Sequence, residues 1–176
     1  MNPELFLLFD ALAIAIAAAV IDVQQRRIPN WLTYSAIGWG VLLRAFYFGW
    51  QGLFTALGGC LLAGGIVFLF YVVRAMGAGD VKLLAGLGAI VGPQQVLIIL
   101  MGTALAGGVM ALVYAAYRGR LWVTLSNVGA VMRFHASSGL RPHPEANLDN
   151  PEALRMPYGL AIAVGTLYAF GTAGWR

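Results

Sequence analysis

The chain has 176 residues, of which 60% are hydrophobic and only 10% carry a charge, and it contains 23 glycines. A soluble domain of this length could not cover so much apolar surface with so few charges, so the composition predicts a polytopic membrane protein. The formal net charge of +4 does not indicate a nucleic-acid partner, because the basic residues are scattered singly between apolar runs. The single cysteine, Cys60, excludes a disulfide framework and a cysteine-based zinc site.

The first half of the chain is expected to form three apolar helices separated by two short polar connections. A spanning helix needs about 20 mostly apolar residues, and about 17 are tolerated. The first polar loop contains Pro29, which disfavours helix before it, and Asn30, which can cap the helix after it. Arg44 falls near the end of the second helix and is expected to snorkel outward. The expected elements are helices at 5–21, about 31–47 and about 53–73, a loop at 22–30 and a glycine-containing turn at 49–52.

The third helix carries two pairs of neighbouring glycines. Small residues in a membrane helix allow another helix to approach closely. We therefore expect a helix–helix contact along this face. The residues are Gly58, Gly59, Gly64 and Gly65.

The second half begins with the turn 74–80 and is then apolar from 83 to 117, apart from a short interruption around Pro93. This stretch is too long for one span and slightly short for two, so we place a break at Pro93. A helix over about 81–91 would be only about 16 Å long. Either Asp80 is drawn below the membrane surface, or the helix continues past Pro93 with a kink. The remaining expected elements are a helix at about 96–117, a polar loop at 118–157 with an amphipathic stretch at 121–134, and a last helix at about 158–172.

The distribution of charge gives this predicted all-α protein an orientation. Six transmembrane helices would place both termini on one side of the membrane and three loops on the other. All basic residues except Arg44 and Arg176 fall on the loop side, and an excess of Lys and Arg marks the cytoplasmic side. The sequence therefore predicts one membrane domain over 1–176 with both termini on the non-cytoplasmic side. Its cytoplasmic loops are about 22–30, 74–80 and 118–157.

Two carboxylates stand at the polar ends of apolar runs: Asp22 after the first run, and Asp80 before the fourth. An ionisable side chain at such a depth is costly and is a functional hypothesis by default. Both fall at the expected cytoplasmic face, so we expect them to meet and to share a proton. The ionised member could take a proton from water while the protonated member donates to a carbonyl oxygen, which is general acid and base chemistry on a peptide bond. The sequence leaves open which aspartate is the base. Asp10 lies about 18 Å from Asp22 along the helix axis, too far to share that proton, and is expected to be an interfacial or helix-contact residue and not a catalytic one.

The residues around Asp80 are expected to support this site. Gly77 and Gly79 would permit backbone angles that other residues resist, and would let a substrate strand or a neighbouring helix come close to Asp80. Asp80 should lie in the first turn of the following helix, where the helix dipole favours its ionised form. Lys82 adds positive charge nearby. The alternative is that Gly77-Ala78-Gly79-Asp80 is only a flexible turn that caps a helix.

Other kinds of site find less support in the sequence. His135 and His143 lie in the long loop without carboxylates at metal-ligand spacing, so no metal is expected. The two glycines at Gly77 and Gly79 lack the third glycine of a dinucleotide fingerprint, and no phosphate-binding loop is present, so no cofactor is expected. Buried acids would also suit a small proton- or cation-coupled transporter or a non-catalytic assembly subunit, and these two functions stay as alternatives.

Three blocks of the sequence together resemble the type IV prepilin leader peptidases, which are membrane aspartic proteases of the Gly-x-Gly-Asp kind. The resemblance implies that Asp22 and Asp80 are the catalytic pair. It also implies a bacterial inner-membrane enzyme that removes the basic leader of a pilin-like precursor, ahead of that precursor's apolar helix, at the cytoplasmic face of the bilayer. The blocks are Asp22 followed by Ile28-Pro29-Asn30, Gly77-Ala78-Gly79-Asp80-Val81-Lys82-Leu83-Leu84, and Met156-Pro157-Tyr158-Gly159-Leu160-Ala161.

The chain departs from the larger members that it resembles, which carry an extra cytoplasmic region with paired cysteines and methylate the new N-terminus. One cysteine and no room for that region lead us to expect peptidase activity without methyl transfer. The chain is most similar to the short peptidases that serve tight-adherence (Flp) pili, with a preflagellin-type or pseudopilin-processing enzyme as the alternative. The loop 118–157 either helps to hold the substrate or only sets orientation through its arginines. Its acids are Glu145, Asp149 and Glu152.

Overall fold

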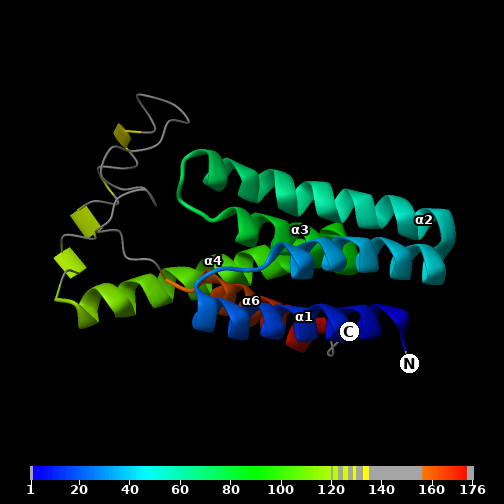
Figure 1. Cartoon of the computed structure of the whole chain (residues 1–176), viewed down its shortest axis with the longest axis horizontal. Coiled ribbons are helices and arrows are strands. Elements are labelled where there is room, and N and C mark those ends of the chain that lie inside the picture. The colour runs from blue at the N-terminus through cyan, green and yellow to red at the C-terminus, as the bar shows by residue number, and fades with distance from the viewer. Residues whose placement is uncertain are drawn as a thin grey trace.

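The computed structural model of the chain describes residues 2–119, 121–122, 125–126, 129, 133–134 and 156–173. In this part of the chain all regular structure is helical and there is no strand (Figure 1). The all-α class predicted from the sequence is therefore confirmed. The helices are α1 (Pro3–Gln25), α2 (Asn30–Val72), α3 (Ala78–Val91), α4 (Pro93–Tyr117) and α6 (Tyr158–Ala173).

Three of these helices, α1, α2 and α4, are long and apolar enough to cross a membrane. They also expose large apolar side chains, such as Phe46 and Leu61 in α2 and Leu105 in α4. Such extensive apolar exposure suits lipid rather than water, so the protein is an integral membrane protein. The count of six spans and the outward position of both termini stay predictions.

The first helix is longer than predicted. It was expected to end at residue 21, but it continues through Asp22 to Gln25. It ends because Arg26 takes a left-handed conformation, with φ 51° and ψ 33°, and donates its N–H to the carbonyl oxygen of Asp22 at 2.7 Å. Asp22 therefore lies in the last turn of α1 and not in the loop 22–30, because no helix-breaking residue follows it before Pro29.

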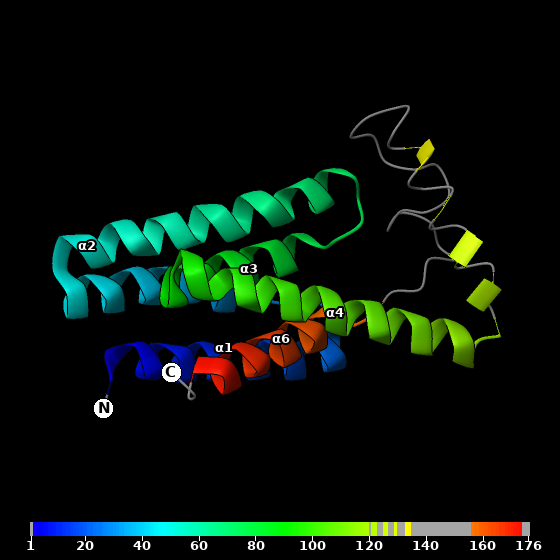
Figure 2. The same ribbon diagram turned by 180° about the vertical axis from the view of Figure 1, so that it is seen from behind.

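Helix α2 is bent into two arms. Gly49 has φ 59° and ψ −141°, which is not helical, within an otherwise continuous helix. The chain reverses there, and the two arms run antiparallel (Figures 1 and 2). Glycine adopts such angles without a steric penalty. The predicted turn is confirmed at Gly49, whereas residues 50–52, also predicted in the turn, are helical and belong to the second arm. The helices predicted at 31–47 and 53–73 correspond to the two arms.

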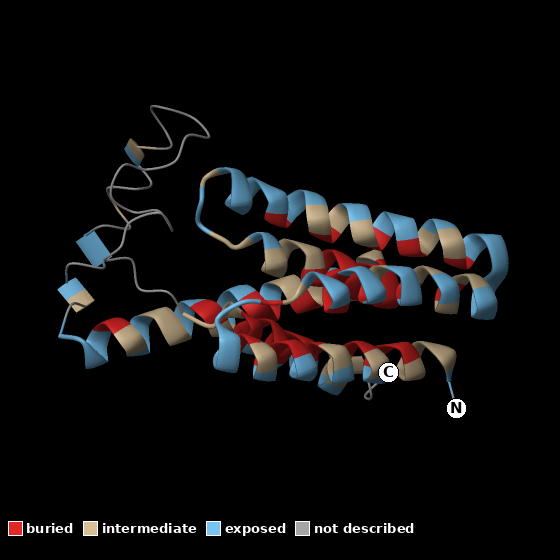
Figure 3. Ribbon diagram, viewed as in Figure 1, coloured by how far each residue is buried: buried red, intermediate tan, exposed pale blue. Residues whose placement is uncertain are grey.

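Helix α3 is the buried centre of the structure (Figure 3). Every residue from Leu83 to Val91 is buried, and the helix packs against α1, α2 and α4. A helix that is apolar all round is typical of a core position. Its 14 residues correspond to about 21 Å, which is shorter than the roughly 30 Å hydrocarbon core. It begins at Ala78, earlier than the predicted 81, and Asp80 lies in its first turn as predicted.

The junction between α3 and α4 is a single residue. Gly92 has φ 81°, and Pro93 is in the first turn of α4. The chain reverses at this point (Figure 2), so the alternative of one helix that continues past Pro93 with a kink is wrong. Proline fits the start of α4 because its missing N–H would have no acceptor there.

Close packing between α2 and α3 depends on one of the predicted glycines. A Cβ atom on Gly59 would collide with the carbonyl group of Gly88 in α3, and a Cβ on Gly88 would collide with the carbonyl group of Gly59. Gly64 comes only within van der Waals contact of α3, while Gly58 and Gly65 have nothing within 4 Å. The prediction that all four glycines admit a neighbouring helix is therefore wrong for Gly58 and Gly65.

Gly59→Ala is expected to destabilise the protein by about 1–3 kcal/mol, because the added methyl group must push two helix backbones apart. Gly58→Ala is the matched control on the same arm. It should be neutral or stabilising by up to about 1 kcal/mol, since alanine is the better helix former. Thermal unfolding of both variants in one detergent compares them, and equal midpoints would contradict the close contact.

Two polar side chains of the apolar helices find partners inside the bundle. Arg44 is only 4% exposed; it donates to the carbonyl oxygens of the last two residues of α3 and pairs with Glu4 at 3.0 Å. The prediction that Arg44 snorkels outward is wrong, because unsatisfied carbonyl groups at the end of α3 offer it partners within the protein. Asp10 accepts a hydrogen bond from the indole of Trp39 at 2.8 Å, which confirms that it is a helix-contact residue.

One end of the bundle gathers the end of α1, the start of α3 and the start of α6 (Figures 1 and 2). The start of α1 and the end of α6 lie at the other end, and α6 packs against both α1 and α4. Most of the predicted loop 118–157, and half of its amphipathic stretch 121–134, lies outside the described residues. The same holds for His135, His143, Glu145, Asp149 and Glu152.

Candidate active site

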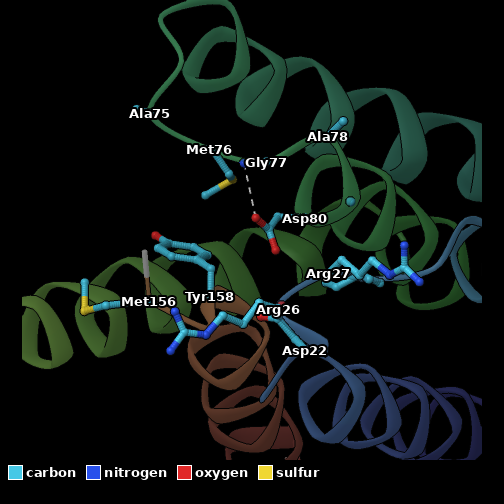
Figure 4. Close-up of a pocket in the computed structure, with 12 residues that line it drawn as sticks. Asp22, Arg26, Arg27, Ala75, Met76, Gly77, Ala78, Asp80, Met156 and Tyr158 are labelled. Atoms are coloured by element: carbon cyan, nitrogen blue, oxygen red, sulfur yellow. Dashed lines mark hydrogen bonds between the residues drawn. The ribbon is translucent and has the colours of Figure 1, made fainter. Parts of the chain in front are cut away.

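Two acidic side chains from distant parts of the chain line one pocket. Asp22 is in the last turn of α1 and Asp80 is in the first turn of α3. Because α1 ends where α3 begins, both carboxyl groups reach a pocket of about 470 Å³ at that end of the bundle (Figure 4). The structure thus brings together the two aspartates that the sequence analysis paired. The other lining residues are Arg26, Arg27, Ile28, Ala75, Met76, Gly77, Ala78, Gly79, Met156 and Tyr158.

Asp22 is almost fully enclosed, with an exposed fraction of 6%. Its Oδ2 atom accepts the backbone N–H of Gly159 at 2.8 Å. Gly159 is in the first turn of α6, where N–H groups have no acceptor within the helix. The start of α6 therefore supplies a hydrogen-bond donor, and the positive end of a helix dipole, to a carboxylate on α1.

Asp80 is held by the turn that precedes its own helix. Its Oδ2 atom accepts the N–H of Gly77 at 3.3 Å, so the carboxylate caps the helix in which it lies. Burial, and after it the negative charge of Asp22, raise the pKa of the Asp80 carboxyl from 3.8 to about 7, against the opposing hydrogen bond from Gly77. Asp80 lies outside the three helices long enough to span a membrane. Near neutral pH the two carboxyl groups can therefore hold one proton between them.

The raised pKa of Asp80 makes the stability of the protein depend on pH. The folded state binds this proton more tightly than the unfolded chain, so the contribution is fully present below 3.8 and is lost as the pH rises through about 7. We expect the protein to unfold at a lower temperature in mildly alkaline than in mildly acidic buffer. The difference in the free energy of unfolding between the two buffers is at most a few kcal/mol, because one pKa unit corresponds to about 1.4 kcal/mol. Asp80→Asn should lose this part of the pH dependence in thermal unfolding, and an unchanged dependence would contradict the raised pKa.

Comparison with known proteins assigns the chain to a family. A model described as the type IV leader peptidase family matches residues 10–112, a region that contains both Asp22 and Asp80. The chain belongs to the type IV leader peptidase family. The resemblance found in the sequence is therefore confirmed at the level of the family.

Two curated members of this family are similar to the chain. They are the prepilin leader peptidase/N-methyltransferases of Burkholderia pseudomallei strains 1026b and K96243, each 34% identical to it over 125 residues. The match covers 64% of this chain but only 38% of each relative, so the chain spans well under half the length of the relatives that it matches. No solved structure matches the chain.

Gly77 and Gly79 allow close contacts and do not adopt unusual backbone angles. Neither has a positive φ, so the prediction of special backbone angles is wrong. A Cβ on Gly77 would lie 3.1 Å from Oδ2 of Asp80, and a Cβ on Gly79 would lie 3.2 Å from the Cβ of Ile28. The predicted close approach of a neighbouring segment is right at Gly79, where the α1–α2 connection packs.

Lys82 does not line the pocket. Its Nζ atom donates to Oδ1 of Asn30 at 3.0 Å and lies 4.8 Å from the ring centroid of Tyr34. Residues two apart on a helix do not face each other, so Asp80 and Lys82 serve different faces of α3. Lys82 therefore joins α3 to the start of α2, and this geometry gives no support to its predicted role beside Asp80.

The start of α6 contributes two pocket features that sequence reasoning missed. Tyr158 lines the pocket and packs so closely on α4 that a Cβ on Gly107 would lie 3.0 Å from its hydroxyl oxygen. The backbone of Gly159 reaches Asp22. The sequence analysis named the block 156–161 only as part of the family resemblance, and the local signal within it is Pro157 directly before an apolar run, which predicts a helix start. It does not reveal which carboxylate the first amide groups of that helix will meet.

A second pocket of about 470 Å³ lies between α4 and α6. It is almost entirely apolar and contains no carboxylate, so it offers no pair of groups for proton transfer. Within the described ranges, no group of three or more His, Cys, Asp and Glu side chains could hold a metal ion. The expectation that the protein uses neither a metal nor another cofactor stays a prediction.

Proposed function

We propose that the chain is an aspartic endopeptidase of a bacterial inner membrane that removes the basic leader of a type IV pilin-like precursor of the Flp type. The observation that carries this proposal is the meeting of Asp22 and Asp80 in one pocket, in a chain of the leader peptidase family. The names of its relatives, prepilin leader peptidase/N-methyltransferase, agree with removal of a leader by hydrolysis.

The acid pair suits hydrolysis of a peptide bond by general acid and base catalysis. The ionised carboxylate takes a proton from water, whose oxygen bonds to the carbonyl carbon of the scissile peptide. The protonated carboxyl gives its proton to the carbonyl oxygen, so a neutral tetrahedral intermediate forms. A proton then passes to the leaving nitrogen, the carbon–nitrogen bond breaks, and the pair again holds a single proton.

The charge around the pocket supports cleavage at the cytoplasmic face. Arg26 and Arg27 line the pocket, and Arg74 lies in the turn that leads to it. An excess of basic residues marks the cytoplasmic side of a membrane protein. In this proposal the pocket opens to the cytoplasm, the chain spans the membrane six times, and both termini face outward.

We also propose that the chain does not methylate the shortened product. Its sequence contains a single cysteine, Cys60, which lies in the second arm of α2. A region built on paired cysteines cannot form from this sequence. The proposed reaction therefore ends with release of the leader and a free α-amino group on the product.

Incubation of the purified protein with pilin precursors from its own genome, in detergent and with S-adenosylmethionine, tests the proposal. Mass spectrometry should find a product that lacks the leader and has gained no methyl group. The Flp-type precursor should be cleaved faster than pseudopilin precursors. A precursor left at full length by a folded protein would contradict peptidase function, and proton flux through liposomes containing that protein would favour the transporter instead.

A further inference from the structure

The two aspartates of the pocket are held in different ways. Asp22 accepts a 2.8 Å hydrogen bond from Gly159, which belongs to another helix, and the contact is buried. Asp80 accepts a longer, 3.3 Å hydrogen bond from Gly77, in its own helix cap. The pair is therefore not symmetric, even before a substrate is bound.

The donor to Asp22 has a fixed position. Gly159 follows Pro157 and Tyr158 at the start of α6, and the next amide, that of Leu160, bonds back to Pro157 at 3.2 Å. The ring of Tyr158 is held against Gly107 of α4. A rigid N–H group at the positive end of a helix favours an ionised acceptor, because a hydrogen bond to a charged carboxylate is stronger than one to a neutral carboxyl.

We propose that the first turn of α6 sets the charge state of the acid pair: Gly159 holds Asp22 as the ionised carboxylate, and Asp80 carries the shared proton. If the proposed function holds, on which this inference rests, Asp22 is the base that takes a proton from water. Asp80 is then the acid that donates to the carbonyl oxygen. Gly159 acts as a positioning residue, because its N–H contacts Asp22 and not the substrate.

The other ionisable groups that face Asp22 do not oppose this assignment. Those that line the pocket with it are Arg26 at the C-cap of α1, Arg27 in the α1–α2 connection, Asp80 from α3 and Tyr158 from α6. Within the described residues neither aspartate forms an ion pair with either arginine, so no salt bridge selects Asp80 as the charged member. Burial and the charge of Asp22 raise the pKa of Asp80 to about 7, which agrees with a proton on Asp80 near neutral pH.

The contact also explains why a glycine stands at position 159. A Cβ added there would lie 3.0 Å from both the Cβ and the Oδ2 of Asp22, which is closer than ordinary contact. Gly159→Ala should therefore push the carboxylate off its donor. Gly171→Ala, in the same helix, is the matched control, because nothing lies within 4 Å of a Cβ at that position.

Chemical labelling of each carboxyl group can test the assignment without any substrate. Dicyclohexylcarbodiimide adds to protonated carboxylic acids, and mass spectrometry of the digested full-length protein reports the label at each aspartate as a function of pH. In the wild-type protein, Asp80 should label up to about neutral pH, whereas labelling of Asp22 should be lost at a lower pH. The midpoint of each curve is compared and not its extent, because the two side chains differ in access to the reagent.

The glycine variants complete this experiment. In Gly159→Ala the midpoint for Asp22 should rise by about one to two pH units, the size expected for loss of a hydrogen bond to a charged group. Gly171→Ala should match the wild type. If Asp22 keeps its label to a higher pH than Asp80 in the wild-type protein, or if Gly159→Ala folds with an unchanged Asp22 midpoint, the assignment is overturned. Should Gly159→Ala not fold, the order of the two wild-type midpoints still decides.

Cleavage assays separate this inference from the proposed function. Labelling in the expected order by a protein that cleaves no precursor would support the charge assignment and contradict the peptidase. Cleavage by a protein whose two labelling midpoints are in the reverse order would support the peptidase and contradict the charge assignment. In an active enzyme, Gly159→Ala should move the acid limb of the pH profile of kcat to higher pH and leave the alkaline limb in place, a pattern that general loosening of the fold would not give.

Discussion

Replacement of Asp80 by asparagine is expected to slow leader removal by about a thousandfold or more, and Asp22→Asn should have an effect of similar size. General acid or base catalysis contributes about 10²–10⁴ to a rate, and an amide can neither accept a proton from water nor donate the shared one. Both substitutions keep the shape of the side chain, so the pocket of Figure 4 should persist. The initial rate of appearance of the shortened precursor, followed by mass spectrometry with purified protein, measures the effect.

Asp10→Asn provides the control for these variants. Asp10 lies on the same helix as Asp22, but its partner is the indole of Trp39, and an amide oxygen can accept that hydrogen bond as well. Its cleavage rate should stay within a few-fold of the wild type. The double variant Asp22→Asn, Asp80→Asn should be no slower than either single variant, because two groups that act as a unit are lost together. Normal processing by both single variants would remove the two aspartates from the mechanism.

The meeting of Asp22 and Asp80 could be predicted because it depends on chain-level features. Each stands at the polar end of an apolar run, and the two antiparallel arms of α2 between them return the chain to the same end of the bundle (Figure 1). The turn at Gly49 and the break at Pro93 could likewise be predicted, since glycine and proline act on the local backbone. The order of the sequence and the local backbone geometry are enough to predict these features.

The contacts that adjust the site could not be predicted, because they depend on which faces of distant helices pack together. The bond between Gly159 and Asp22 joins residues 137 positions apart, and no local pattern marks it. Lys82 was predicted beside Asp80, but the rotation of α3 turns it toward Asn30. Gly58 and Gly59 look alike in the sequence, and only packing against α3 separates them. The sequence thus indicated the two candidate groups, while the tertiary structure gives them different hydrogen-bond donors.

Arg44→Met is expected to destabilise the protein by about 3 kcal/mol, although it replaces a charged residue in an apolar helix by an apolar one of similar length. In the folded protein Arg44 donates to the carbonyl oxygens of Ile90 and Val91. These residues end α3, so their carbonyl oxygens receive no hydrogen bond from an N–H group of the same helix. Removal of the guanidinium leaves these buried groups without their donor, at about 1–3 kcal/mol each. The positive charge also favours this end of the helix dipole.

Glu4→Gln separates the carbonyl contacts of Arg44 from its ion pair. The Glu4 side chain is 47% exposed, so the pair with Arg44 is partly screened and contributes less than about 1 kcal/mol. Glu4→Gln should therefore lower the midpoint of thermal unfolding far less than Arg44→Met in the same detergent. Asp80 lies at the other end of α3, so a loosened α3 should also let Asp22 and Asp80 move apart. We therefore expect Arg44→Met to lose cleavage activity at a lower temperature than Glu4→Gln does. Equal midpoints of thermal unfolding for the two variants would mean that Arg44 stabilises the protein through its ion pair with Glu4 and not through its hydrogen bonds to the end of α3.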